Sequence, residues 1–110
     1  MQVITKKELD GFYGTENYYK HWTGYFNYTD GVRFLEVSGA AWLIDLIASY
    51  NRKEPFQVWK LHVKDNKGIV TMQEDKDTPI LVKQETFTDF CLPSIELWLI
   101  DGVLILPSEY

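Results

Sequence analysis

The sequence predicts an α+β fold, with N-terminal helices packed on a C-terminal antiparallel β-meander of four to five strands. Three observations favour this fold class. Apolar residues between positions 40 and 48 recur at helical spacing, whereas from Pro55 onward they alternate with a period of two. Turn sequences at residues 65–68 and 101–102 then divide the second half into short strands.

The length and composition bound the class of protein. Of the 110 residues, 45% are hydrophobic and 25% are charged, which predicts one globular domain over residues 1–110. Cys91 is the only cysteine, so the chain can form neither an internal disulfide nor a cysteine-based metal site, and a reducing cytoplasm fits best. No segment has the apolar length of a membrane span or of a secretion signal. We therefore expect no membrane association, and no motif calls for a cofactor.

The formal net charge of −5 is concentrated in the C-terminal part of the chain. Residues 67–110 contain three basic residues against eight acidic ones. This distribution argues against direct, non-specific binding of DNA or RNA, which requires a basic face. It leaves open a positively charged protein partner, for which the candidate contact residues are Glu74, Asp75, Asp77, Glu85 and Asp89. Solubility alone also explains such charges.

Helix start and stop signals mark the N-terminal half. Thr5 and Glu8 have the spacing of a capping box, which predicts a helical turn over residues 5–9, ended by Gly11. Residues 29–31 predict a second helix start, and residues 38–39 interrupt that helix. Residues 40–50 form the strongest predicted helix, apolar nearly all round, which indicates a buried central helix. Asp45 is its only charged residue.

An aromatic segment lies between these helices. Thr15 can cap a further short helix that carries Tyr18, Tyr19 and Trp22 on one face. Such a cluster can stack on a flat ligand or bind a partner, but a nucleobase platform would add basic residues, and Lys20 is the only one between positions 8 and 32. Packing in the core or at an interface is therefore the favoured interpretation.

The second half reads as consecutive strands. Residues 57–64, 69–73 and 80–87 are expected to pair in order, with Trp59, Leu61 and Val63 facing inward. Residues 95–100 and 103–106 form the clearest hairpin, because Asp101 and Gly102 suit a type I′ turn. These last two strands are apolar on both faces, so their second face must also be covered. A homodimer interface or the aromatic segment can cover it.

His21 and Asp45 are the candidates for a pocket. A carboxylate in an apolar helix must be paired, hydrogen-bonded or protonated. It can serve as a general acid or base, or it can accept hydrogen bonds and fix how the helix docks. The second interpretation is favoured, because no nucleophile or second carboxylate shares a motif with Asp45. The two histidines, His21 and His62, match no zinc spacing, so no metal site is expected.

Six segments carry a resemblance to a known family: GTENYYKH at 14–21, YTDGV at 28–32, AWLID at 41–45, FQVW at 56–59, TDF at 88–90 and LPSEY at 106–110. In these segments the chain resembles a family of small bacterial and phage proteins catalogued only as a domain of unknown function. The resemblance spans nearly the whole chain and implies a bacterial or mobile-element origin. It supplies no catalytic residues.

Two functions of different classes follow. The leading hypothesis is a small acidic, non-enzymatic protein-binding module, and by analogy with other small phage proteins its partner can be a nucleic-acid-guided defence nuclease with a basic channel, as for anti-CRISPR inhibitors. The alternative is a small enzyme or ligand-binding domain with a pocket around Asp45 and His21. The binding surface is expected on the acidic strands or on the aromatic segment.

Overall fold

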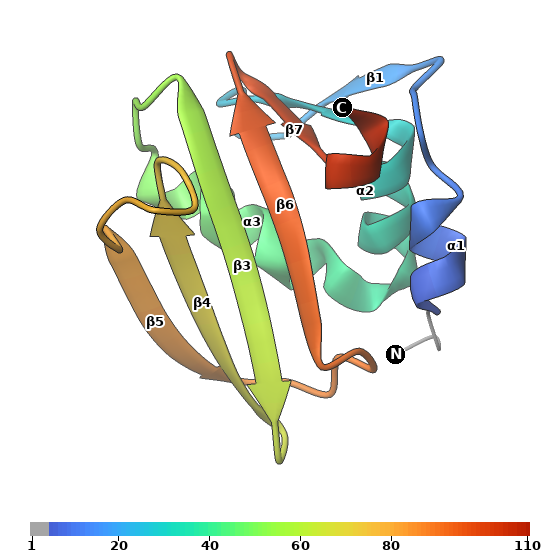
Figure 1. Ribbon diagram of the computed structural model, residues 1–110. Coiled ribbons are helices and arrows are strands. Elements are labelled where there is room, and N and C mark those ends of the chain that lie inside the picture. Colours follow the sequence, from blue (N-terminus) through green and yellow to red (C-terminus); the bar gives the residue numbers. More distant parts are fainter. Residues whose placement is uncertain (1–4) are drawn as a thin grey trace.

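A seven-stranded mixed sheet forms the framework of the protein in the computed structural model, which describes residues 5–110 (Figure 1). The strands lie in the order β1-β2-β7-β6-β3-β4-β5. Their bounds are β1 Tyr18–Lys20, β2 Asn27–Thr29, β3 Phe56–Lys64, β4 Lys67–Gln73, β5 Val82–Phe87, β6 Ser94–Ile100 and β7 Val103–Ile105. The helical elements are α1 Lys6–Asp10, α2 Asp30–Leu35, the π-helical turn η1 Glu36–Ala40, α3 Ala41–Tyr50 and the 3₁₀ turn η2 Pro107–Glu109.

The predicted fold class, N-terminal helices on a C-terminal meander, is wrong. Two strands of the sheet, β1 and β2, come from the N-terminal half, and β2 pairs with β7 in parallel. The C-terminal strands are not joined in simple order either, since β6 crosses back to pair with β3 instead of following β5. The contacts that create this order join residues far apart in the sequence, and turn signals do not report them.

The helix expected over residues 15–22 is replaced by a turn and strand β1. The carboxylate of Asp30 accepts the backbone N–H groups of Glu16 at 3.0 Å and Asn17 at 3.3 Å. The hydroxyl of Thr15, expected as a helix cap, instead accepts the backbone N–H of Asp30 at 2.9 Å. These bonds hold the segment beside the start of α2, so the aromatic residues that follow enter a strand, which suits them equally well.

The remaining helix signals are confirmed. Thr5 and Glu8 form the capping box, with the Glu8 N–H 3.1 Å from the Thr5 hydroxyl. Thr29 caps α2 through the N–H of Val32. Gly39 kinks the run at η1 with a φ of 107°, so α2, η1 and α3 follow one another as a single bent helical run.

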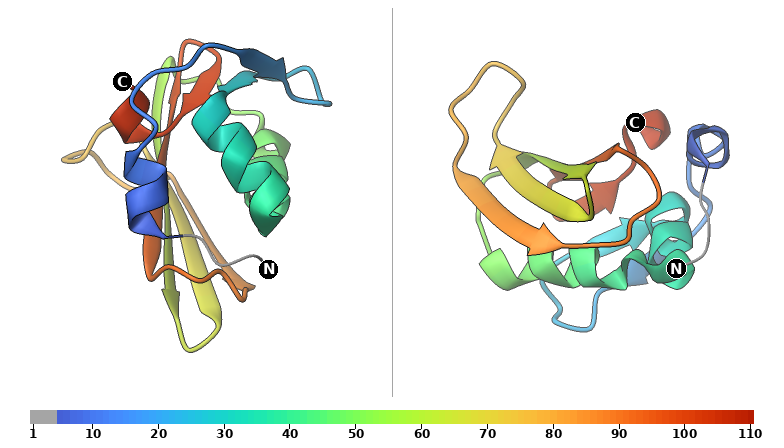
Figure 2. Two further views of the ribbon diagram at one scale, coloured as in Figure 1. Left: turned by 90° about the vertical axis from the view of Figure 1, so that its right-hand side faces the viewer. Right: turned by 90° about the horizontal axis from the view of Figure 1, so that it is seen from below.

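Helix α3 covers one face of the sheet, and its far side is only partly covered (Figure 2). Leu43, Ile44 and Ile47 are buried, but Asp45 is exposed and Trp42 is only half-buried. The expectation of a helix buried all round is therefore wrong, because the protein places a single layer of helices on the sheet. No helix within residues 5–110 is long and apolar enough to cross a membrane.

The two turns that the sequence marked in its second half are confirmed. Asp65 and Asn66 have φ values of 54° and 62°, and Asp101 and Gly102 have values of 47° and 83°, as type I′ turns require. The second face of the last hairpin is only partly covered within the chain. Trp98 contacts Phe56 and Tyr110, with ring centroids 5.8 Å and 5.5 Å away, and both Trp98 and Ile100 remain half-buried.

Candidate functional site

The residues between β1 and β2 form a turn that lies against helix α3. His21 and Trp22 come directly after β1, and Asp45 projects from α3. The turn is closed by a backbone hydrogen bond from Gly24 to His21 at 2.8 Å, with Gly24 at a φ of 76°. The structure thus brings together the two residues that the sequence marked for a pocket and one of its candidate aromatic residues.

His21 is buried, with 1% of its surface exposed, and both of its ring nitrogens are occupied. The Nε2 atom lies 2.8 Å from Oδ1 of Asp45. The other ring nitrogen, Nδ1, lies 2.8 Å from the hydroxyl oxygen of Thr23 and 3.2 Å from its backbone nitrogen. Because a carboxylate can only accept, Nε2 donates its N–H to Asp45.

Trp22 is the most unusual side chain of the site. Its surface is 79% exposed, yet its indole N–H donates to Oδ1 of Asp45 at 3.0 Å. The indole also lies near the imidazole of His21, with ring centroids 5.5 Å apart. One carboxylate oxygen therefore accepts both a buried and an exposed donor, and the second of these bonds orients the indole on the surface.

Tyr18 and Tyr19 have different environments. Tyr18 is exposed on the β1–β2 hairpin. Tyr19 is half-buried, stacks on Tyr28 with centroids 5.7 Å apart, and donates its hydroxyl to Asp30 at 3.1 Å. That hydrogen bond to a carboxylate raises the pKa of Tyr19 above its usual value. Of the three candidate aromatic residues, Tyr18 and Trp22 are open to a partner, and Tyr19 contributes to packing.

The acidic candidates lie at the other edge of the sheet. Strand β1 and strand β5 are the two edges of the sheet, and every acidic candidate belongs to β5 or to the loops at its ends. All five are exposed: Glu74, Asp75, Asp77, Glu85 and Asp89. The acidic surface formed by these five residues and the exposed residues Tyr18 and Trp22 thus lie at different edges of the sheet, and the sequence order gave no indication of this.

The hollows on the surface lie elsewhere. One of about 420 Å³ lies between α1 and β6, and a shallower one of about 530 Å³ is lined by residues near Trp42 and Phe87. Neither of these two hollows is lined by His21 or Asp45. Across residues 5–110, no three side chains of His, Cys, Asp or Glu are grouped so that they could hold a metal ion. No sequence pattern predicted the hollow beside β6.

The fold and the site together define a small sheet-rich protein that displays a hydrogen-bonded tryptophan at one edge of its sheet. The chain belongs to a family of unknown function, DUF6876, whose sequence model matches residues 3–110. No curated protein and no solved structure matches the chain.

Proposed function

We propose that this protein is a non-enzymatic protein-binding module that uses Trp22 as its anchor. The observation that carries the proposal is the combination of 79% exposure of Trp22 with its hydrogen bond to Asp45. Tryptophan and tyrosine dominate the binding energy of protein interfaces, because each buries a large apolar area around one polar group. Tyr18 is a second exposed aromatic residue of the same hairpin.

The hydrogen bond to Asp45 improves Trp22 as an anchor. A free surface side chain loses rotamer entropy when a partner immobilises it, and that loss weakens binding. The indole of Trp22 is already held by Asp45, which is itself held by the buried imidazole of His21. The two hydrogen bonds that Asp45 accepts, from His21 and from Trp22, therefore support a binding surface in which the indole is oriented before a partner binds.

The same network disfavours an enzyme centred on His21. A general base needs a ring nitrogen within hydrogen-bond reach of its substrate. In His21, Nε2 is engaged by Asp45 and Nδ1 by Thr23. The arrangement instead supports a positioning role, in which His21 and Asp45 dock the hairpin on α3 and orient Trp22.

The acidic surface supports a more specific version of the proposal. Exposed carboxylates on β5 and in the loops at its ends attract a basic partner, and the nucleic-acid channel of a bacterial or phage defence nuclease is a partner of that kind. In this version the protein competes with nucleic acid for the channel, as an inhibitor. Because the β5 edge is far from Trp22 in the strand order, the two surfaces can be tested by separate variants.

Affinity capture with matched variants tests the anchor. The tagged protein is used to recover partners from cells that encode it, and Trp22→Ala is compared with Phe87→Ala, which removes an aromatic ring of similar exposure (84%) at the other edge. We expect one saturable partner, lost with Trp22→Ala and kept with Phe87→Ala. A partner that Trp22→Ala still recovers would disprove the anchor.

Charge variants test the acidic version. We expect the combined variant Glu74→Gln, Asp75→Asn and Asp77→Asn to weaken partner binding more at low salt than at high salt. At high salt, screening by ions already removes the long-range attraction between the carboxylates and the partner. If nucleic acid does not compete with this protein for the recovered partner, the inhibitor version is wrong, whereas the Trp22 anchor is unaffected.

A further inference from the structure

The N-terminal half of strand β6 has no strand beside it on the side away from β3. Strand β3 pairs with β6 along its whole length, from Ser94 to Ile100. Strand β7 pairs only with the other half, through Trp98 to Ile100. The segment from Ser94 to Leu97 is therefore an open edge inside the sheet, next to helix α1 (Figure 1).

The backbone groups that face this open edge can be identified. Asp101 donates its N–H to the carbonyl of Pro55 at 2.9 Å, and the carbonyl of Pro93 accepts the N–H of Val63 at 2.8 Å. The backbone N–H and C=O groups of the odd-numbered residues in this segment therefore point toward β3. Backbone groups alternate between the two sides of a strand. The N–H and C=O groups of Ser94 and Glu96 therefore point away from β3, and they make no hydrogen bond to any residue in the range 5–110.

Pro107 explains why β7 stops short. Continuing the register from the Trp98–Ile105 pair places Pro107 opposite Glu96. Proline has no N–H to donate, and the chain turns there into η2. The β6–β7 ladder thus ends before Glu96 and Ser94, and the backbone groups of these two residues remain available.

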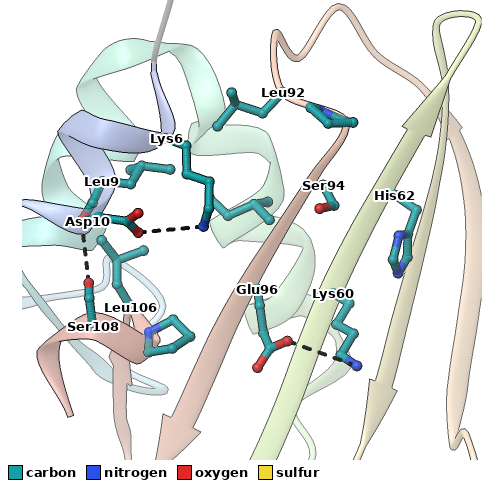
Figure 3. A pocket seen from close by; sticks show the side chains of 13 residues that line it. Lys6, Leu9, Asp10, Lys60, His62, Leu92, Ser94, Glu96, Leu106 and Ser108 are labelled. Carbon is teal, nitrogen blue, oxygen red and sulfur yellow. Dashed lines mark hydrogen bonds and ion pairs between the residues drawn. The ribbon is translucent and has the colours of Figure 1, made fainter.

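A hollow of about 420 Å³ lies in front of these groups, between α1 and β6 (Figure 3). Its apolar lining includes Leu9, Ile95 and Leu106. Its charged groups are paired with each other: Lys6 lies 3.6 Å from Asp10, and Lys60 lies 3.9 Å from Glu96. The volume is within the range of ligand sites, and the paired charges favour an uncharged occupant with apolar side chains.

We propose that this hollow binds an extended peptide segment of a partner protein, which adds to β6 as a short strand. Ser94 and Glu96 offer two N–H donors and two C=O acceptors, repeated every second residue, about 6.6 Å apart. Another extended backbone matches that spacing, and its alternate side chains reach the lining at Leu9 and Leu106. This site shares no residue with the Trp22 surface and does not depend on the function proposed for it.

Selection from short random peptides displayed on phage tests the site. Peptides that bind the full chain are then measured against Ser94→Pro, Ser94→Ala and Trp22→Ala. Ser94→Pro removes a donor that faces the hollow, at the first residue of a strand, where proline is tolerated. Ser94→Ala keeps that donor and is the matched control.

We expect the affinity of selected peptides for Ser94→Pro to be about fivefold or more lower than for the unaltered protein. Their affinity for Ser94→Ala and for Trp22→Ala should equal that for the unaltered protein. Amide hydrogen exchange on the unaltered protein gives a second readout. Glu96 should exchange faster than Leu97 in the free protein, and bound peptide should slow Glu96.

Three outcomes would overturn the proposal. The first is selection of no peptide at all. The second is a set of peptides that leave Glu96 exchange unchanged and depend on Trp22, which would support the Trp22 surface instead. The third is self-association of the protein that Ser94→Pro abolishes, since the occupant would then be a second copy of this chain.

Discussion

The Nε2 atom of His21 lies 2.8 Å from Oδ1 of Asp45, and this bond joins the β1–β2 hairpin to helix α3. The two residues are 24 positions apart in the sequence. The same carboxylate oxygen also accepts the indole N–H of Trp22, which orients that side chain. One pair therefore links the docking of a hairpin to the display of an exposed indole.

Removing this carboxylate should destabilise the fold. We expect Asp45→Ala to lower the free energy of unfolding by about 1–3 kcal/mol, because it leaves the buried Nε2–H of His21 without an acceptor. Urea denaturation measures the loss. Ser49→Ala, at another exposed position of α3, should change stability by less than about 0.5 kcal/mol. Equal stability of Asp45→Ala and the unaltered protein would show that the pair does not anchor the hairpin.

Glycine at position 31 should be required for packing of the C-terminus on α2. A Cβ added there would lie 2.6 Å from Leu106 Cδ1 and 2.7 Å from Glu109 Oε1. Glu109 also accepts the N–H of Gly31 at 3.1 Å. We expect Gly31→Ala to cost about 1–3 kcal/mol in thermal or chemical denaturation.

The matched control for this substitution is Gly14→Ala. A Cβ at Gly14 meets no atom within 4 Å, so this variant should be neutral or slightly more stable. Equal losses in the two variants would mean that contact with Leu106 and Glu109 is not the cause.

Acid should weaken the hydrogen bonds that hold the start of β1. Backbone N–H donation from Glu16, followed by bonds from Tyr19 and Thr15, holds the pKa of Asp30 below its usual value of 3.8. A group with a lowered folded pKa stabilises the protein above its unfolded pKa and loses that contribution as the pH falls through the folded value. Asp30→Asn should therefore be less stable than the unaltered protein near neutral pH, and the difference should narrow below pH 3.8.

Thermal denaturation followed from neutral pH to about pH 3 measures this difference. A constant difference in stability across that range would show that the ionised carboxylate of Asp30 is not what holds residues 16 and 17.

The last hairpin should depend on glycine at position 102. Gly102 has a φ of 83°, which a residue with a Cβ adopts at a cost of about 1–2 kcal/mol. We expect Gly102→Ala to lose stability by that amount in chemical denaturation. Asp101→Asn is the control, since asparagine also tolerates positive φ and should be close to neutral. A neutral Gly102→Ala would mean that the turn relaxes to another type.

Local signals predicted the parts of the fold that local contacts determine. The capping box at Thr5, the cap at Thr29 and the positive φ at Gly102 all depend on residues within a few positions of one another. The segment around Tyr18 was predicted wrongly for the same reason. Its aromatic spacing suits a helix or a strand, and Asp30, twelve residues later, decides between them.

The sequence predicted candidate residues for the site but not their contacts or their positions in the fold. The sequence marked Asp45 as a carboxylate that needs a partner and marked His21 as a candidate for the same pocket. It could not show that His21 is the buried partner, that Trp22 remains exposed on the same oxygen, or that the acidic residues lie at the opposite edge of the sheet.

The sequence by itself determined the helix ends, the two tight turns and the alternation of the central strands, because these depend on backbone preferences and on the spacing of neighbouring residues. Only the tertiary structure decided the parallel pairing of β2 with β7, the open edge of β6 beside Pro107 and the position of Trp22. Each of these depends on backbone or side-chain hydrogen bonds between distant segments, and a hydrogen-bonding group has no partner until the chain has folded around it.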